Sequence, residues 1–126
     1  MENRVTKVIL IVDDEPANID TIKNLIPAEY KCKAVTKGQI ALKQINKQKP
    51  DMMILDLIMP GMNGIETLTE VRKIYSQTQL PTLIVSGTKK PEQFDALQTL
   101  GISGLITKPV DSAQFDTILM QTFGSN

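Results

Sequence analysis

The stretch KVILIVDDEPANI, residues 7–19, indicates the fold class of this chain. Its first six residues form an apolar, β-branched run, which is typical of a strand covered on both faces. Asp14 is placed to cap a helix with Pro16 near its first turn, and isoleucines then recur at helical spacing as far as Pro27. A buried strand that leads directly into an amphipathic helix predicts an α/β fold.

The same alternation of strand and helix recurs four more times along the chain. Further strands are expected at Lys31–Val35, Met52–Leu57, Thr82–Ser86 and Gly104–Thr107. Further helices are expected at about Gln39–Lys47, at about Ile65–Tyr75, from Pro91 through Leu100, and from Asp111 or Ser112 through Thr122. Right-handed crossovers between such units give a parallel sheet with helices on both faces. We therefore predict one domain over residues 1–126, a doubly wound, five-stranded sheet in the flavodoxin-like order 2-1-3-4-5.

The composition of the chain excludes several classes of function. Lys plus Arg and Asp plus Glu both number 14, and aromatic residues make up only 4%, so we expect no direct nucleic acid partner. The apolar runs are strand-sized, far below the length of a membrane span, and the start MENRVTKVIL lacks a signal-peptide pattern. A cytoplasmic location without a membrane partner is therefore the expectation.

The chain contains no histidine. Nucleophilic sites of the Ser-His-Asp and Cys-His types are therefore excluded, as are HExxH metal sites. Any bound metal ion must be held mainly by oxygen ligands, which favours magnesium, calcium or manganese. The single cysteine, Cys32, falls in an expected strand and is interpreted as a small buried apolar residue rather than a reactive thiol.

Three carboxylates are expected to converge at one end of the sheet. Asp13 and Asp14 end the first strand, and Asp56 lies near the end of the third. In open α/β sheets, ligands bind at the carboxyl ends of the strands where the strand order reverses. Two like charges about 4 Å apart repel by ~4 kcal/mol at an effective dielectric constant of about 20, and a hard divalent cation would offset this repulsion.

Two further polar groups end the remaining strands. Ser86 ends the fourth strand, and Lys108 follows the fifth. Singly, they are interpreted as a strand-end hydroxyl and a solvated lysine, just as Asp13 and Asp14 alone could merely cap a helix. Asp56 inside an apolar run is harder to explain, because an isolated buried carboxylate is costly. Together the groups favour phosphoryl transfer, with one carboxylate as the nucleophile.

Four sequence strings resemble the signature of receiver domains in two-component response regulators. They are VDDE at 12–15, DLIMPGMNGIE at 56–66, SGT at 86–88 and KP at 108–109. Their order and spacing match that family across nearly the whole chain, and the four strings in register are much more specific than any one alone.

The resemblance implies a magnesium site, which manganese would also fit. Asp14 and Asp56 would bind the ion directly, and the backbone carbonyl of Ile58 would be the third protein ligand. Asp13 would act largely through water bound to the metal ion.

The resemblance also implies roles around the phosphoryl group. Asp56 would accept the group, Ser86 would donate a hydrogen bond to its oxygens, and Lys108 would pair with the remaining negative charge. The peptide bond between Lys108 and Pro109 would be cis, a geometry of about 5–6% of X-Pro bonds in folded proteins.

The partners follow from the same resemblance. A histidine kinase or a histidine phosphotransfer protein would supply the phosphoryl group, since this chain has no histidine of its own. The chain would be a signalling domain rather than an enzyme, although it would assist its own phosphorylation and a slow dephosphorylation. The face made by the fourth helix, the fifth strand and the fifth helix would change conformation. That face would engage a downstream effector domain or protein, or form a phosphorylation-dependent dimer.

Two features depart from or refine the family pattern. Leu105 takes the position of an aromatic residue whose ring moves together with the hydroxyl residue, here Ser86, so this coupled switch is expected to be either lost or replaced by an aliphatic version. Ile58 and Thr88 hold the positions that tune the lifetime of the phosphoryl group. Because the side chain of Ile58 cannot orient an attacking water by hydrogen bonding, we expect slow autodephosphorylation.

Other functions remain open on the sequence alone. A non-phosphorylated interaction module would keep the fold without the chemistry. A phosphohydrolase of the haloacid dehalogenase type needs DxDx[TV] after the first strand, where this chain has DDEPA. A flavin binder needs a phosphate cradle rich in hydroxyl groups and glycine, which the same loop lacks.

Overall fold

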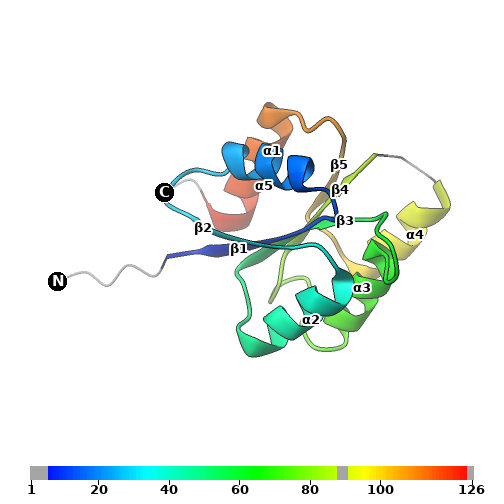
Figure 1. Cartoon of the computed structure of the whole chain (residues 1–126). Coiled ribbons are helices and arrows are strands. Elements are labelled where there is room, and N and C mark those ends of the chain that lie inside the picture. The colour runs from blue at the N-terminus through cyan, green and yellow to red at the C-terminus, as the bar shows by residue number, and fades with distance from the viewer. Residues whose placement is uncertain (1–5, 88–90, 125–126) are drawn as a thin grey trace.

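The protein is a five-stranded parallel sheet with helices on both faces (Figure 1). The computed structural model describes residues 6–87 and 91–124, without the side chains of residues 91 and 92. The strands are β1 (Val8–Val12), β2 (Lys31–Val35), β3 (Met52–Asp56), β4 (Thr82–Ser86) and β5 (Gly104–Thr107). The helices are α1 (Pro16–Leu25), α2 (Gly38–Lys47), α3 (Gly64–Arg72), α4 (Pro91–Leu100) and α5 (Ser112–Phe123). The observed order β2-β1-β3-β4-β5 confirms the predicted fold.

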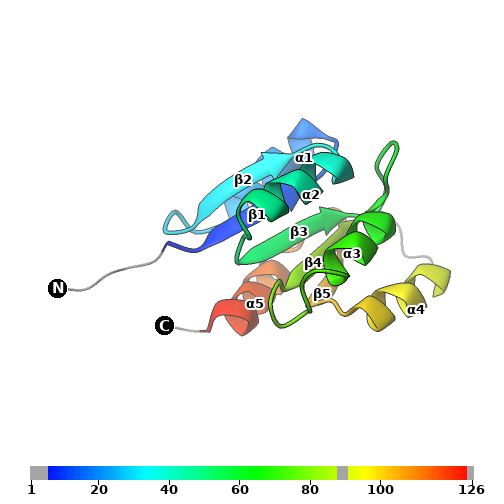
Figure 2. The ribbon, with the colours of Figure 1, turned by 90° about the horizontal axis from the view of Figure 1, so that it is seen from below.

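Two apolar layers hold the helices against the sheet. One layer, the α1/α5 core, is built around Ile9, Ile11, Ile22, Ile54, Val85, Phe115 and Leu119. The other, the α2–α4 core, is built around Leu10, Val12, Ile45, Met53, Leu55, Leu68, Ile84 and Leu97. Figures 1 and 2 show α1 and α5 on one side of the sheet and α2, α3 and α4 on the other. Because strand side chains alternate between the two faces, a strand covered on both reads as a continuous apolar run.

Helix boundaries depart from the predictions at several places, of which the ends of α1 and α3 are the most informative. Asp14 does not cap α1, because the helix begins one residue later, with Glu15 as an N-cap that makes no side-chain capping bond. Helix α3 ends at Arg72, so Tyr75 lies beyond it. Asn63 begins α3 with a reciprocal capping box, in which Asn63 and Glu66 each accept a backbone hydrogen bond from the other.

Three further expectations can be compared with the structure. Asp111 caps α5 as expected, accepting a hydrogen bond from the amide of Ala113. Cys32 is half-buried beside the α1/α5 core rather than fully buried, and this burial raises the pKa of its thiol. Leu57 lies one residue beyond β3, although its side chain is buried. Among the described residues, no helix has the length and apolar character needed to cross a bilayer.

Gly64 brings α3 close to the end of β3, which makes it the basis of a stability prediction. A Cβ atom at Gly64 would collide with the carbonyl oxygen of Asp56 and would lie 2.7 Å from the Cα atom of Leu57. We expect Gly64→Ala to lower the free energy of unfolding by about 2 kcal/mol, since backbone rather than a flexible side chain must move. Urea unfolding followed by circular dichroism would measure this loss.

Gly87→Ala is the matched control for that substitution, because no described residue lies within 4 Å of a Cβ atom there. The control should change the urea midpoint little. Equal midpoints for the two variants would contradict the close approach of α3 to β3.

Candidate functional site

The predicted site residues lie together at the carboxyl edge of the sheet. Asp13 follows β1, Asp56 ends β3, Ser86 ends β4 and Lys108 follows β5. All five strands are parallel, so these ends meet at one edge (Figure 1). The hydrophobic strands therefore bring together polar groups that are far apart in the sequence.

Asp13 is buried and held on every side. Its side chain is 1% exposed, and its backbone amide donates to the carbonyl of Val35 at 3.1 Å. The amide of Glu15 donates to Oδ1 at 2.9 Å, and the ammonium of Lys108 donates to Oδ2 at 3.2 Å. A carboxylate with this number of partners is fixed in position.

Lys108 joins the two buried carboxylates. Besides its bond to Asp13, its Nζ lies 3.5 Å from Oδ2 of Asp56. Its backbone amide donates to the carbonyl of Ser86 at 2.8 Å, and its bond to Pro109 is cis, as the resemblance implied. The lysine is therefore aimed into the acidic cluster rather than into solvent.

Asp56 is the carboxylate whose titration the site perturbs. Its pKa is raised, first by burial and then by the negative charge of Asp13, with a smaller effect from Asp14. Lys108 and the amide of Ile58, which lies 3.4 Å from Oδ1, act in the opposite direction. The ionised form of Asp56 is therefore disfavoured while no cation reinforces Lys108.

Three carboxylates are close enough to share a metal ion. Asp13, Asp14 and Glu15 each offer an oxygen within 4.8 Å of the others. Glu15 was not singled out from the sequence, although it follows the two aspartates directly. Asp56 is outside this group, and so its role as a metal ligand stays a prediction. Oxygen-only ligation of this kind suits a hard cation such as Mg²⁺.

The remaining predicted positions surround this cluster. Ser86 is fully buried at the end of β4. The side chain of Ile58 is 54% exposed, and its predicted carbonyl contact to a metal ion is not tested. Leu105 is half-buried and packs against the α2–α4 core, and its role in a switch stays a prediction. Thr88 lies outside the described residues.

The chemistry available at this edge is narrow. Asp56 offers a carboxylate nucleophile, Lys108 a positive charge beside it, and Ser86 a hydroxyl group. Asp13 and Asp14 add negative charge that favours a divalent cation. With no histidine or thiol at the edge, the set matches phosphoryl transfer, in which positioning and charge neutralisation supply most of the catalysis.

Comparisons with known proteins agree with this chemistry. Residues 9–120 match the family model described as the response regulator receiver domain. The chain is 36% identical to a protein-glutamate methylesterase/protein-glutamine glutaminase of Halalkalibacterium halodurans, over 92% of the chain and 34% of that protein. It is 33% identical to the alkaline phosphatase synthesis transcriptional regulatory protein PhoP of Bacillus subtilis, over 83% of the chain and 43% of that protein. The chain thus spans less than half of these relatives.

A solved structure of a related protein has the same fold. The chemotaxis protein CheY4 of Vibrio cholerae superposes with a TM-score of 0.81 at 25% identity. The match covers 94% of this chain and 99% of that one.

The raised pKa of Asp56 predicts a pH-dependent gain in stability for Asp56→Asn. The pKa of Asp56 is higher in the folded state than in the unfolded state, so ionisation of this carboxyl group destabilises the fold. The destabilisation is absent in acid, where the group is protonated in both states. This cost grows as the pH rises through the folded-state pKa. In EDTA at pH 7 we expect the variant to gain on the order of 1 kcal/mol, or about 4 °C in Tm, and to gain nothing near pH 3.

Thermal unfolding from pH 3 to pH 8 would check this expectation. Asp20→Asn, at an exposed position of α1, is the control and should show no such pH-dependent gain. A loss of stability for Asp56→Asn at neutral pH would contradict the electrostatic account.

Proposed function

The chain belongs to the response regulator receiver domain family, and we propose that Asp56 is its phosphoryl acceptor. Receiver domains of this family accept phosphoryl groups in two-component systems. The observation that carries the assignment is the position of Lys108, whose ammonium lies within 3.5 Å of oxygens from both Asp13 and Asp56. An ammonium group at that point can pair with the carboxylate before the transfer and with a phosphoryl oxygen after it.

The acidic cluster supports binding of Mg²⁺, or of Mn²⁺. Asp13 and Asp14 offer carboxylate oxygens from the end of β1, with Glu15 beside them. Asp56 and the backbone carbonyl of Ile58 would complete the set of ligands. The ion would neutralise charge that builds up on the phosphoryl oxygens during transfer.

The transfer itself uses few groups of this chain. An oxygen of Asp56 attacks the phosphorus of a phosphohistidine presented by a histidine kinase or a histidine phosphotransfer protein. A P–O bond forms as the P–N bond breaks, and the electron pair leaves with the imidazole of the partner. Lys108 then pairs with the phosphoryl group, and the hydroxyl of Ser86 donates to one of its oxygens. Formation of the acyl phosphate removes the negative charge of the Asp56 carboxylate, and the charge that Lys108 then faces is the one that the phosphoryl group brings with it.

Phosphorylation would shift the conformation of α4, β5 and α5. That face is the proposed surface for a downstream effector domain or protein and for a phosphorylation-dependent dimer. The relatives named above are longer proteins, one an enzyme and one a transcriptional regulator, so the output of the present chain is inferred only as a class. We propose a cytoplasmic signalling domain with no catalytic turnover of its own beyond phosphorylation and slow dephosphorylation.

A non-phosphorylated interaction module is the second candidate. Leu105 favours it, because the aromatic residue of the usual switch is missing. The acidic cluster and the inward-facing Lys108 favour the phosphorylated alternative, since an interaction module has no need to bury two carboxylates.

Incubation with acetyl phosphate and Mg²⁺, followed by intact mass measurement, separates the two candidates. We expect one phosphoryl group on the unmodified chain and none on Asp56→Asn, because the amide is not a nucleophile. Asp95→Asn, at an exposed position of α4, is the control and should be phosphorylated normally. Full labelling of Asp56→Asn, or none of the unmodified chain, would refute the assignment.

The side chain of Ile58 is exposed but has no hydrogen-bonding group that could orient an attacking water, so we expect a long-lived phosphoryl group. Ile58→Asn places an amide beside Asp56 that can orient a water molecule, so we expect loss of the phosphoryl group to accelerate roughly tenfold. Decay of the labelled mass after removal of acetyl phosphate would give the rate. Ile40→Asn, at another exposed isoleucine, should leave the rate unchanged. Equal rates for Ile58→Asn and the unmodified chain would remove Ile58 from this role.

A further inference from the structure

The carboxyl end of α4 is fixed by an arginine from another helix. Arg72, the last residue of α3, donates from Nε to the carbonyl of Leu100 and from Nη2 to the carbonyl of Gly101, both at 2.9 Å. These carbonyls belong to the end of α4, whose last turn has no basic residue of its own. A cation at the end of a helix satisfies its free carbonyls and its dipole.

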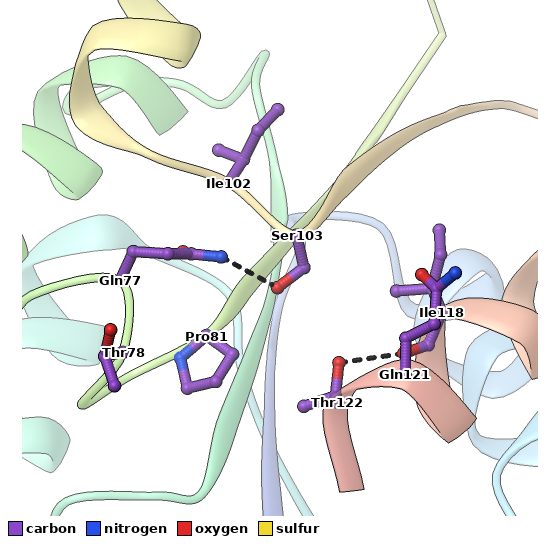
Figure 3. Close-up of a pocket in the computed structure, with 8 residues that line it drawn as sticks. All are labelled: Gln77, Thr78, Pro81, Ile102, Ser103, Ile118, Gln121 and Thr122. Carbon is purple, nitrogen blue, oxygen red and sulfur yellow. Dashed lines mark hydrogen bonds between the residues drawn. The ribbon is translucent and has the colours of Figure 1, made fainter. Parts of the chain in front are cut away.

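The same guanidinium also holds the start of β4. It donates to the carbonyl of Leu80 at 3.1 Å and to Oγ1 of Thr82 at 3.3 Å. It reaches Oε1 of Gln77 at 2.9 Å, and the amide nitrogen of Gln77 donates in turn to Ser103, on the wall of an open pocket (Figure 3). Burial lowers the pKa of Arg72. Among the described residues, its acceptors are neutral groups that join α3, α4 and β4 at the edge opposite the phosphorylation site.

The other end of α4 contains an unsatisfied polar atom. Oε1 of Gln93 is buried and has no hydrogen-bond partner among the described residues. Gln93 lies one helical turn before Leu97, which is buried in the α2–α4 core, so both side chains point toward the sheet. The part of the chain that the structure describes thus offers no donor to this acceptor, which lies at the end of α4 that is remote from Arg72.

A second polar atom of this kind lies on β5, at the carboxyl edge of the sheet. Oγ1 of Thr107 is buried and also lacks a partner among the described residues. Thr107 is two residues after Leu105, which packs in the α2–α4 core, so its side chain lies on the α4 face of the sheet. It is also the register partner of Ser86, the hydroxyl group expected to meet the phosphoryl group.

We propose that α4 is a lever held at its carboxyl end by Arg72, and that phosphorylation closes a hydrogen bond from the Thr107 hydroxyl to Oε1 of Gln93. With neither atom paired to any described residue, the structure has a higher free energy than a state in which the two atoms meet. This polar pair replaces the aromatic switch that Leu105 cannot supply. The proposal rests on Asp56 being the phosphoryl acceptor.

Beryllofluoride with Mg²⁺, a mimic of the aspartyl phosphate, provides the test. Thr107→Val and Gln93→Met each remove one partner at nearly constant volume. Each should weaken beryllofluoride binding roughly fivefold, because the bound state loses one hydrogen bond. The double variant should bind no more weakly than either single variant, since the same bond is lost in all three. Binding would be measured by titration of a fluorescence or NMR signal.

Two controls separate the switch from general damage. Without beryllofluoride, both variants should unfold at an equal or higher urea concentration, because each removes an unsatisfied buried polar group. Thr99→Val, whose hydroxyl bonds only within α4, should bind beryllofluoride as the unmodified chain does. Hydrogen exchange should change on binding at Gln93 and its neighbours while the amides of Leu100 and Gly101 stay constant.

The outcomes of this experiment are distinct. Unchanged binding for Thr107→Val and Gln93→Met, or losses that simply add in the double variant, would overturn the switch while the role of Asp56 stands. Equal exchange changes at both ends of α4 would overturn the lever. Failure of the unmodified chain to bind beryllofluoride would overturn the proposed function and the switch with it.

Discussion

The ammonium group of Lys108 is the interaction on which the functional edge depends. Asp13 and Asp56 are both almost completely buried, and without a positive charge between them their mutual repulsion would oppose the close pairing of β1 and β3. The lysine offsets only part of the cost of burying Asp56 beside Asp13, since the pKa of Asp56 remains raised, first by burial and then by the charge of Asp13. Further positive charge at this edge would therefore lower its free energy, which is the physical argument for the proposed metal ion.

The strands could be predicted because the sheet is covered on both faces, and their order could be inferred from the fold rules for parallel sheets with right-handed crossovers. Strands such as β3 and β4 are fully buried, and buried parallel strands leave continuous apolar runs in a sequence. Helix ends were less predictable, because they depend on single capping contacts. The start of α3 depends on the reciprocal bonds of Asn63 and Glu66, and the start of α1 on the backbone rather than on Asp14.

The candidate site was likewise predictable only in part. Strand order alone was enough to place Asp13, Asp56, Ser86 and Lys108 at one edge, because each lies at or just after the end of a strand. The direction of the Lys108 side chain followed only from the family resemblance. The network around Arg72 could not be predicted at all, because its acceptors come from segments that are adjacent only in the folded chain.

The make-up of that network has an evolutionary consequence. The acceptors of Arg72 are mostly main-chain carbonyls, including those of Tyr75, Leu80 and Leu100. A carbonyl oxygen is present whatever side chain its residue carries, so most partner positions can drift in sequence without loss of the contact. Substitution of the arginine itself has no such tolerance. Among homologues that keep this network, the arginine should therefore be retained while its neighbours vary, a pattern that would conceal the importance of the surrounding loops from sequence comparison.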